Sequence, residues 1–120
     1  MQNREIVIDG VKYVLGKYNF GVEMDIAEQC MDVNVTGSGK NMKASPSIRT
    51  GKMQVLQIVH SLKFWEFKGI NEEGNFIIDA TKGTLQINEE NVRTLPSKHG
   101  KMLLEIAKEL NDVSEEEVKN

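Results

Sequence analysis

The sequence predicts one α+β domain, in which an N-terminal β-hairpin precedes a mainly helical part with three main helices. Two observations point to this class: two β-rich runs flank an Asp-Gly pair, and apolar residues further along recur at helical spacing. The chain has 120 residues, close to the usual size of one domain and enough for a modest core. We assign the domain to residues 1–113 and expect an acidic polar tail over residues 114–120.

The N-terminal hairpin is predicted by the sequence around Asp9 and Gly10. This pair separates two runs that are rich in β-branched and aromatic residues. Because both residue types tolerate the positive φ of a tight hairpin turn, the pair is a strong hairpin signal. We place the two strands at about residues 4–8 and 11–15.

The first helix is predicted by an apolar stripe. Val22, Ile26 and Cys30 recur every four residues, which is the spacing of one helix face. We therefore expect a helix over about residues 20–32, and Asn19 is placed to act as its N-cap.

Two further main helices and a short one follow. The helix expected over about residues 47–66 carries the widest apolar arc, so we interpret it as the central element of the fold. Asn88 is placed to cap a short helix over about 89–95. The clearest periodic pattern in the chain predicts a last amphipathic helix, with Ser97 as its N-cap.

Two segments lack a clear hydrophobic periodicity. Residues 34–47 are polar and rich in Gly and Ser, so we expect a mobile loop. Residues 75–87 contain two short β-rich runs, which predict a small second hairpin. The alternative is a loop over the whole of residues 68–88, which would be long for a domain of this size.

Composition argues against several classes of function. The formal net charge is −3, whereas nucleic-acid-binding domains are usually basic, so we expect no nucleic-acid partner. No run of about 20 apolar residues is present, so we expect no membrane span. One cysteine and two histidines cannot complete a zinc site of the usual spacing, so we expect no metal and no other cofactor. The N-terminus resembles no signal peptide, which favours the cytoplasm.

Motifs for chemistry are weak. The Gly-Ser-Gly-Lys segment at residues 37–40 resembles part of a phosphate-binding loop, but that motif requires Gly at the position of Asn34 and Ser or Thr at that of Asn41. No Ser, Cys or Asp lies at a diagnostic spacing from either histidine. We expect no catalytic residues. A small enzyme or nucleotide-binding protein that uses Lys40 and His60 is the third-ranked alternative.

The candidate partner-binding surface is apolar. Phe64, Trp65 and Phe67 cluster at the end of the predicted central helix, and an apolar arc this wide is hard to cover in a small protein. We group Leu103 and Leu110 of the last helix with them. Burial in the core is the competing explanation for each of the five.

Several short segments of the sequence resemble those of the tail assembly chaperones of long-tailed bacteriophages. Four segments carry the resemblance: the strand pair at Ile8–Leu15, the segment Lys17–Gly21 that leads into a helix, the pattern Ile87–Pro96, and the end of the amphipathic helix at Ala107–Asn111. These segments lie toward the two ends of the chain. Their motifs are structural and carry no catalytic group.

The resemblance implies a non-enzymatic role. Such chaperones coat the helical tape measure protein in the host cytoplasm before the tail tube polymerises around it, and they are absent from the finished virion. The expected partner is therefore the tape measure protein, with the tail tube protein as a second candidate and self-association left open. The main alternative is a structural tail protein, such as a tube, terminator or connector subunit, which would stay in the virion.

Overall fold

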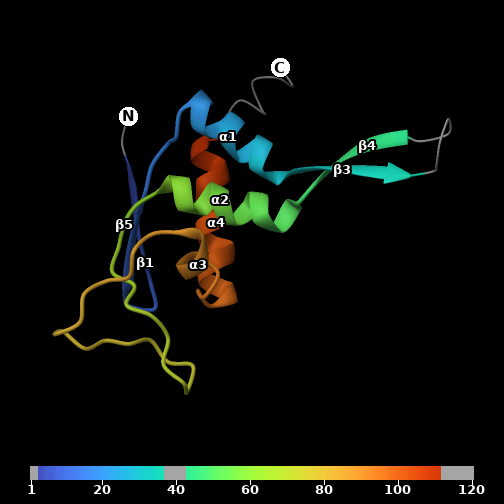
Figure 1. Ribbon diagram of the computed structural model, residues 1–120. Coiled ribbons are helices and arrows are strands. Elements are labelled where there is room, and N and C mark those ends of the chain that lie inside the picture. The colour runs from blue at the N-terminus through green and yellow to red at the C-terminus, as the bar shows by residue number, and fades with distance from the viewer. Residues whose placement is uncertain (1–2, 37–42, 112–120) are drawn as a thin grey trace.

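The computed structural model describes residues 3–36 and 43–111, and its α+β class agrees with the sequence prediction (Figure 1). The elements follow in the order β1 (Arg4–Ile8), β2 (Val11–Leu15), α1 (Phe20–Cys30), β3 (Met31–Thr36), β4 (Lys43–Ile48), α2 (Thr50–Ser61), β5 (Leu62–Trp65), α3 (Glu89–Val92) and α4 (Ser97–Asn111). The predicted acidic tail over residues 114–120 lies outside the described residues.

The N-terminal hairpin has the predicted bounds. β1 and β2 pair antiparallel, with Ile8 opposite Val11. Between them Asp9 has a φ of 50° and Gly10 a φ of 83°. Two consecutive positive φ values define the type I′ turn, whose twist matches that of the flanking strands. A β-carbon on Gly10 would meet no atom within 4 Å, so glycine is favoured here by its backbone freedom.

The central helix is shorter than the predicted span of residues 47–66. α2 ends at Ser61, and the chain continues directly as β5, which joins a three-stranded sheet of order β1-β2-β5. From Phe64 onward, exposed and buried residues alternate, which is the period of a strand. The prediction of a helix was wrong here because, in so short a run, the spacing of the aromatic residues fits the periodicity of a helix and that of a strand equally well.

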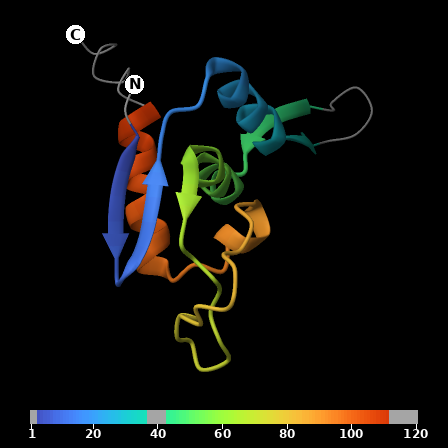
Figure 2. The same ribbon diagram turned by 90° about the vertical axis from the view of Figure 1, so that its left-hand side faces the viewer.

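The core lies between this sheet and the helices α2 and α4, which cover one face of it (Figure 2). Trp65 and Phe67 meet edge to face at a centroid distance of 5.1 Å, and Trp65 lies 6.4 Å from Tyr13 in the same way. The indole nitrogen of Trp65 donates a hydrogen bond to the Leu85 carbonyl at 2.7 Å. A smaller cluster of Ile26, Cys30 and Leu56 joins α1 to α2.

The loop predicted over residues 34–47 is wrong for the part of it that the structure describes. β3 and β4 pair antiparallel from Met31 opposite Ile48 to Thr36 opposite Lys43. The Gly and Ser residues that suggested a loop are concentrated between the two strands, and residues 37–42 lie outside the described residues. In the flanking sequence, polar and apolar residues alternate, and this strand period was overlooked.

The second hairpin predicted at about residues 75–87 is also wrong. Residues 66–88 are all described and contain no strand, apart from an isolated bridge between Ile70 and Phe76. The segment is the loop of the alternative prediction. Leu85 and Ile87 pack against the main core instead of pairing with another strand. The Leu85 amide donates to the Phe67 carbonyl at 2.9 Å.

Two predicted helix caps are confirmed, whereas Ser97, predicted as the cap of the last helix, is the first residue of α4. The Asn19 side chain accepts a hydrogen bond from the Val22 amide at 2.9 Å, and the Asn88 side chain accepts one from the Asn91 amide at 2.8 Å. Each cap satisfies one of the amides that a helix start leaves without an internal partner. α1 and α3 therefore begin where the sequence predicts.

Candidate functional site

The five residues predicted to bind a partner do not form one surface. Trp65, Phe67 and Leu103 are each at most 2% exposed, so assigning them to a surface was wrong. Trp65 and Phe67 alternate with exposed neighbours along the chain and contribute to the core against α4. Phe64 is 46% exposed, and Leu110 is half-buried against the core.

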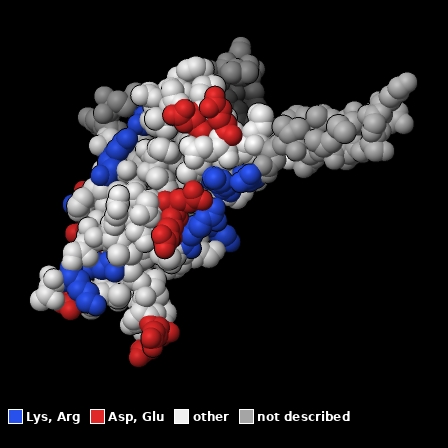
Figure 3. Space-filling view, viewed as in Figure 1, with Lys and Arg blue, Asp and Glu red and all other residues white. Residues whose placement is uncertain are grey.

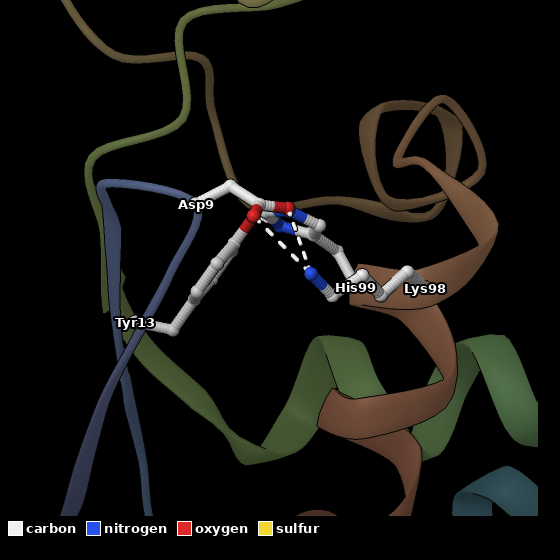
Figure 4. A network of polar contacts seen from close by, with 4 residues as sticks. All are labelled: Asp9, Tyr13, Lys98 and His99. Carbon is white, nitrogen blue, oxygen red and sulfur yellow. Dashed lines mark hydrogen bonds and ion pairs between the residues drawn. The ribbon is translucent and has the colours of Figure 1, made fainter.

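A polar network joins the hairpin to the start of α4 (Figure 4). His99 Nε2 lies 2.9 Å from Asp9 Oδ2, and His99 Nδ1 lies 2.7 Å from the Tyr13 hydroxyl. Because a carboxylate only accepts, the neutral ring carries its proton on Nε2, and Nδ1 accepts the hydrogen bond that Tyr13 donates. Lys98 Nζ lies 3.2 Å from Asp9 Oδ1.

The environment shifts the pKa values of two groups in this network. Hydrogen bonds from His99 and Lys98 lower the pKa of Asp9 below its ordinary value of 3.8. Burial raises the pKa of the Tyr13 hydroxyl, because the anion loses its hydration. His99 is 1% exposed and both of its ring nitrogens are hydrogen-bonded, so the network supports the packing of α4 and offers no free base to a substrate.

A groove lies between α2, α3 and α4. It encloses about 310 Å³. Its apolar lining comes from Val55, Ile58, Val92 and Leu104, and its small and polar lining comes from Gly51, Gln54, Arg93, Ser97, Gly100 and Lys101. Figure 3 shows basic side chains beside acidic ones on the face that carries these three helices.

Each long wall of the groove is one helical stripe. On α2 the lining residues are 51, 54, 55 and 58, and on α4 they are 97, 100, 101 and 104. Both sets follow the spacing i, i+3, i+4, i+7, so they share one side of their helix. The residues of α4 that are buried, including His99 and Leu103, form a different stripe.

Small residues widen the groove at its two helical walls. A β-carbon on Gly51 or on Gly100 would meet no atom within 4 Å. This site was not predicted from the sequence, because its α4 wall consists of Ser, Gly, Lys and Leu and therefore carries little hydrophobic signal. A second stripe of small residues beside the buried stripe of α4 is the pattern that could have revealed it.

The charged groups at the groove belong to α3 and α4. Arg93 is held by an ion pair with Glu89, with 3.0 Å between Arg93 Nη2 and Glu89 Oε2. Lys101 is exposed, and no ion pair joins it to another described residue. The groove therefore combines an apolar lining with Lys101 and an Arg93 whose charge is paired with Glu89.

The open face of the sheet is less suited to a partner. Phe64 and Val7 are exposed there, but they share the face with charged residues. Lys12 forms an ion pair with Glu5 at 3.3 Å and lies 6.0 Å from the centroid of the Phe64 ring. This mixture of apolar and charged side chains is typical of a sheet face in water.

Comparison of the chain with protein-family models, with curated proteins and with solved structures finds no match. Function is therefore inferred from the surfaces described above and from the sequence segments that resemble a known family.

Across residues 3–36 and 43–111, no three His, Cys, Asp or Glu side chains come together in a group that could hold a metal ion. Within the same ranges, no helix has both the length and the apolar character needed to cross a bilayer.

The Asp9 network predicts how stability depends on pH. Because the pKa of Asp9 is lowered in the folded chain, its stabilisation is complete above pH 3.8 and is lost as the pH falls through the lower, folded pKa. Asp9→Asn keeps a favourable Asn-Gly turn but removes the carboxylate. We expect wild type to exceed this variant in unfolding free energy at pH 6, and the difference to shrink below about pH 4.

Urea unfolding at a series of pH values measures this difference. Asp25→Asn is the matched control, since Asp25 lies exposed on α1 and has no hydrogen bond to another described residue. A constant difference between wild type and Asp9→Asn down to pH 2 would show that the carboxylate does not act as described.

Proposed function

We propose that this protein is a phage or prophage tail assembly chaperone, which binds the helical tape measure protein in the host cytoplasm and catalyses no reaction. The observation that carries this proposal is the groove between α2, α3 and α4. Its two long walls are helical stripes, and Val55 and Leu104 are the partly exposed part of its apolar lining, whereas Ile58 and Val92 are buried. A groove of this kind fits the apolar face of an amphipathic helix.

The small residues of the groove support a helical occupant. A helix backbone with its side chains is about 10 Å across, so it can approach two walls closely only where these carry short side chains. Gly51, Ser97 and Gly100 provide such positions near the starts of α2 and α4. The apolar floor then meets the apolar stripe of the bound helix, which would otherwise promote aggregation.

The identity of the partner is inferred from the sequence segments that resemble a known family. Their resemblance to tail assembly chaperones points to the tape measure protein, with the tail tube protein as a second candidate. The groove replaces the five-residue surface that the sequence predicted, and none of those five residues lines it. Phe64 remains an exposed apolar residue outside the groove and serves as a test of the alternative face.

Filling the groove tests its role in binding. Gly100→Leu places a side chain into the open space beside Gly100, where a β-carbon meets no neighbour. The substitution also replaces glycine within a helix, which favours the folded state by up to about 1 kcal/mol. We expect this variant to fold at least as stably as wild type and to bind the tape measure protein at least about tenfold more weakly.

The measurement is co-expression of the chain with the tape measure protein of the same phage, followed by co-purification and a binding titration. Gly83→Leu is the matched control, because Gly83 is exposed, has equal room for a β-carbon and lies outside the groove. If wild type fails to bind, the proposed function is wrong. If Gly100→Leu binds normally while Phe64→Ser does not, the sheet face is the binding surface.

Mass spectrometry of purified virions separates the chaperone from a structural tail protein. A chaperone leaves when the tube is complete, so we expect no peptide of this chain in mature particles, whereas it should be abundant in infected cells. Peptides present in fixed proportion to the tube subunit would support the structural alternative and contradict our proposal.

A further inference from the structure

The helix α1 has a second apolar stripe in addition to the one that packs against α2. The buried stripe contributes Ile26 and Cys30 to the smaller core cluster. The second stripe follows the spacing i, i+4, i+7, i+11, which is that of one helix side. It consists of Phe20, Met24, Ala27 and the C-cap residue Met31. Because a surface helix needs only one apolar stripe to join its core, the second stripe is not required to hold α1 in place.

This second stripe, which we call the α1 face, lies at the surface. Phe20 is 72% exposed, Met24 is 39% exposed and Met31 is 53% exposed. Ile48, which is also exposed, lies opposite Met31 in the β3–β4 register and adjoins the end of the face. Adjoining exposed apolar side chains mark an interaction surface, whereas single ones need no explanation. Methionine side chains adapt readily to the shape of a partner.

Carboxylates flank the α1 face on both sides. Glu23 is four residues before Ala27, and Glu28 is four residues after Met24. At about 3.6 residues per turn, these two steps turn in opposite directions away from the stripe, so each carboxylate adjoins one of its edges. Both side chains are exposed, and no ion pair joins either of them to another described residue. α1 carries a third carboxylate, Asp25, and no Lys or Arg, and Figure 3 shows acidic side chains gathered over this helix.

We propose that the α1 face binds a cationic amphipathic helix of another protein. Such a helix has an apolar stripe flanked by Lys or Arg, so it would bury this stripe on the α1 face and place its cations beside Glu23 and Glu28. The basic residues Arg49 and Lys52 act electrostatically on the Cys30 thiol, which belongs to the buried stripe of α1, so the acidic flanks are left to the partner.

The same acidic flanks disfavour two other occupants. A second copy of this chain, placed against the first by a two-fold axis, would bring the carboxylates of one α1 against those of the other. An anionic membrane surface attracts basic segments and would repel this helix. Charge therefore selects a cationic partner for a face that apolar contact alone would leave open to all three.

The length of the face sets the strength of binding. Residues 20–31 span about 16 Å at a rise of about 1.5 Å per residue, which matches about three turns of a partner helix. An interface of this length is below standard size, so we expect a dissociation constant of about 10–100 µM. The inference goes beyond the proposed function, because the groove is lined by residues of other elements.

Fluorescence anisotropy with synthetic peptides tests the proposal. The probe is a labelled helical peptide of about 18 residues with Leu on one side and Lys on the other. One matched peptide carries Glu in place of Lys, and the other has the same Leu and Lys residues in scrambled order. We expect the full chain to bind the Leu/Lys helix at least about tenfold more tightly than either matched peptide, and not to sediment with vesicles of phosphatidylcholine and phosphatidylglycerol.

Variants of α1 locate the binding site. Met24→Lys places a cation within the stripe and should weaken binding of the Leu/Lys peptide at least about tenfold, whereas Met24→Leu should bind as wild type does. Glu28→Lys should also weaken binding. Gln29→Lys is the matched control, because it adds the same charge at an exposed position of α1 outside the stripe, and it should change affinity less than about threefold. Leu and Lys are good helix formers, so circular dichroism should show the wild-type fold.

The outcomes separate this inference from the proposed function. No binding of the Leu/Lys peptide up to about 1 mM, equal binding of the Leu/Glu or scrambled peptide, or unchanged affinity in both Met24→Lys and Glu28→Lys would overturn it. Peptide binding that is lost in Gly100→Leu but kept in Met24→Lys would assign the cationic helix to the groove instead. Vesicle binding that Met24→Lys abolishes would assign the α1 face to a lipid surface. Peptide binding as described, without binding of the tape measure protein, would contradict only the proposed function.

Discussion

The contact between the hairpin turn and the first turn of α4 is the constraint on which the rest of the structure depends. His99 uses both ring nitrogens, one toward Asp9 in the turn and one toward Tyr13 on β2. The bond to Tyr13 is buried, where an unpaired partner would cost about 1–3 kcal/mol, whereas the Asp9 carboxylate is half exposed at the edge of the contact. The two hydrogen bonds hold α4 against the sheet. The aromatic residues Tyr13, Trp65 and Phe67 fill the core between the sheet and the helices.

The same turn of α4 also forms a wall of the groove. His99 faces the sheet, while Ser97, Gly100 and Lys101 line the opposite side. Fixing the histidine therefore fixes the position of the groove, and the proposed partner helix would meet a surface that needs little ordering on binding. Such preorganisation strengthens binding, because less conformational entropy is lost.

The parts of the fold that depend on local chemistry could be predicted from the sequence. The Asp9-Gly10 turn, the Asn19 and Asn88 caps and the apolar stripe of α4 each act within a few residues. β5 and the β3–β4 ribbon could not be predicted in this way, since strand pairing depends on partners far along the chain and short runs fit either period. The Asp9–His99 contact spans 90 residues, and no spacing rule connects residues so far apart.

The candidate site could be predicted from the sequence only in part, for a related reason. Hydrophobicity identified Trp65, Phe67 and Leu103 as important, but it could not distinguish a buried residue from an exposed one, because both are apolar. The groove is defined instead by the absence of side chains at Gly51 and Gly100, a feature that appears only when two helices are placed beside each other. The proposed interaction surface therefore lies on the side of α4 opposite to its strongest sequence signal.

Amide hydrogen exchange, with and without bound tape measure protein, tests the central claim most directly. The first turns of α2 and α4 carry amides that lack intrahelical partners and should exchange fast in the free chain. We predict that binding slows exchange in these two turns and in α3, and leaves β1 and β2 unchanged. Protection confined to the open face of the sheet, or none in the two helix starts, would contradict the account.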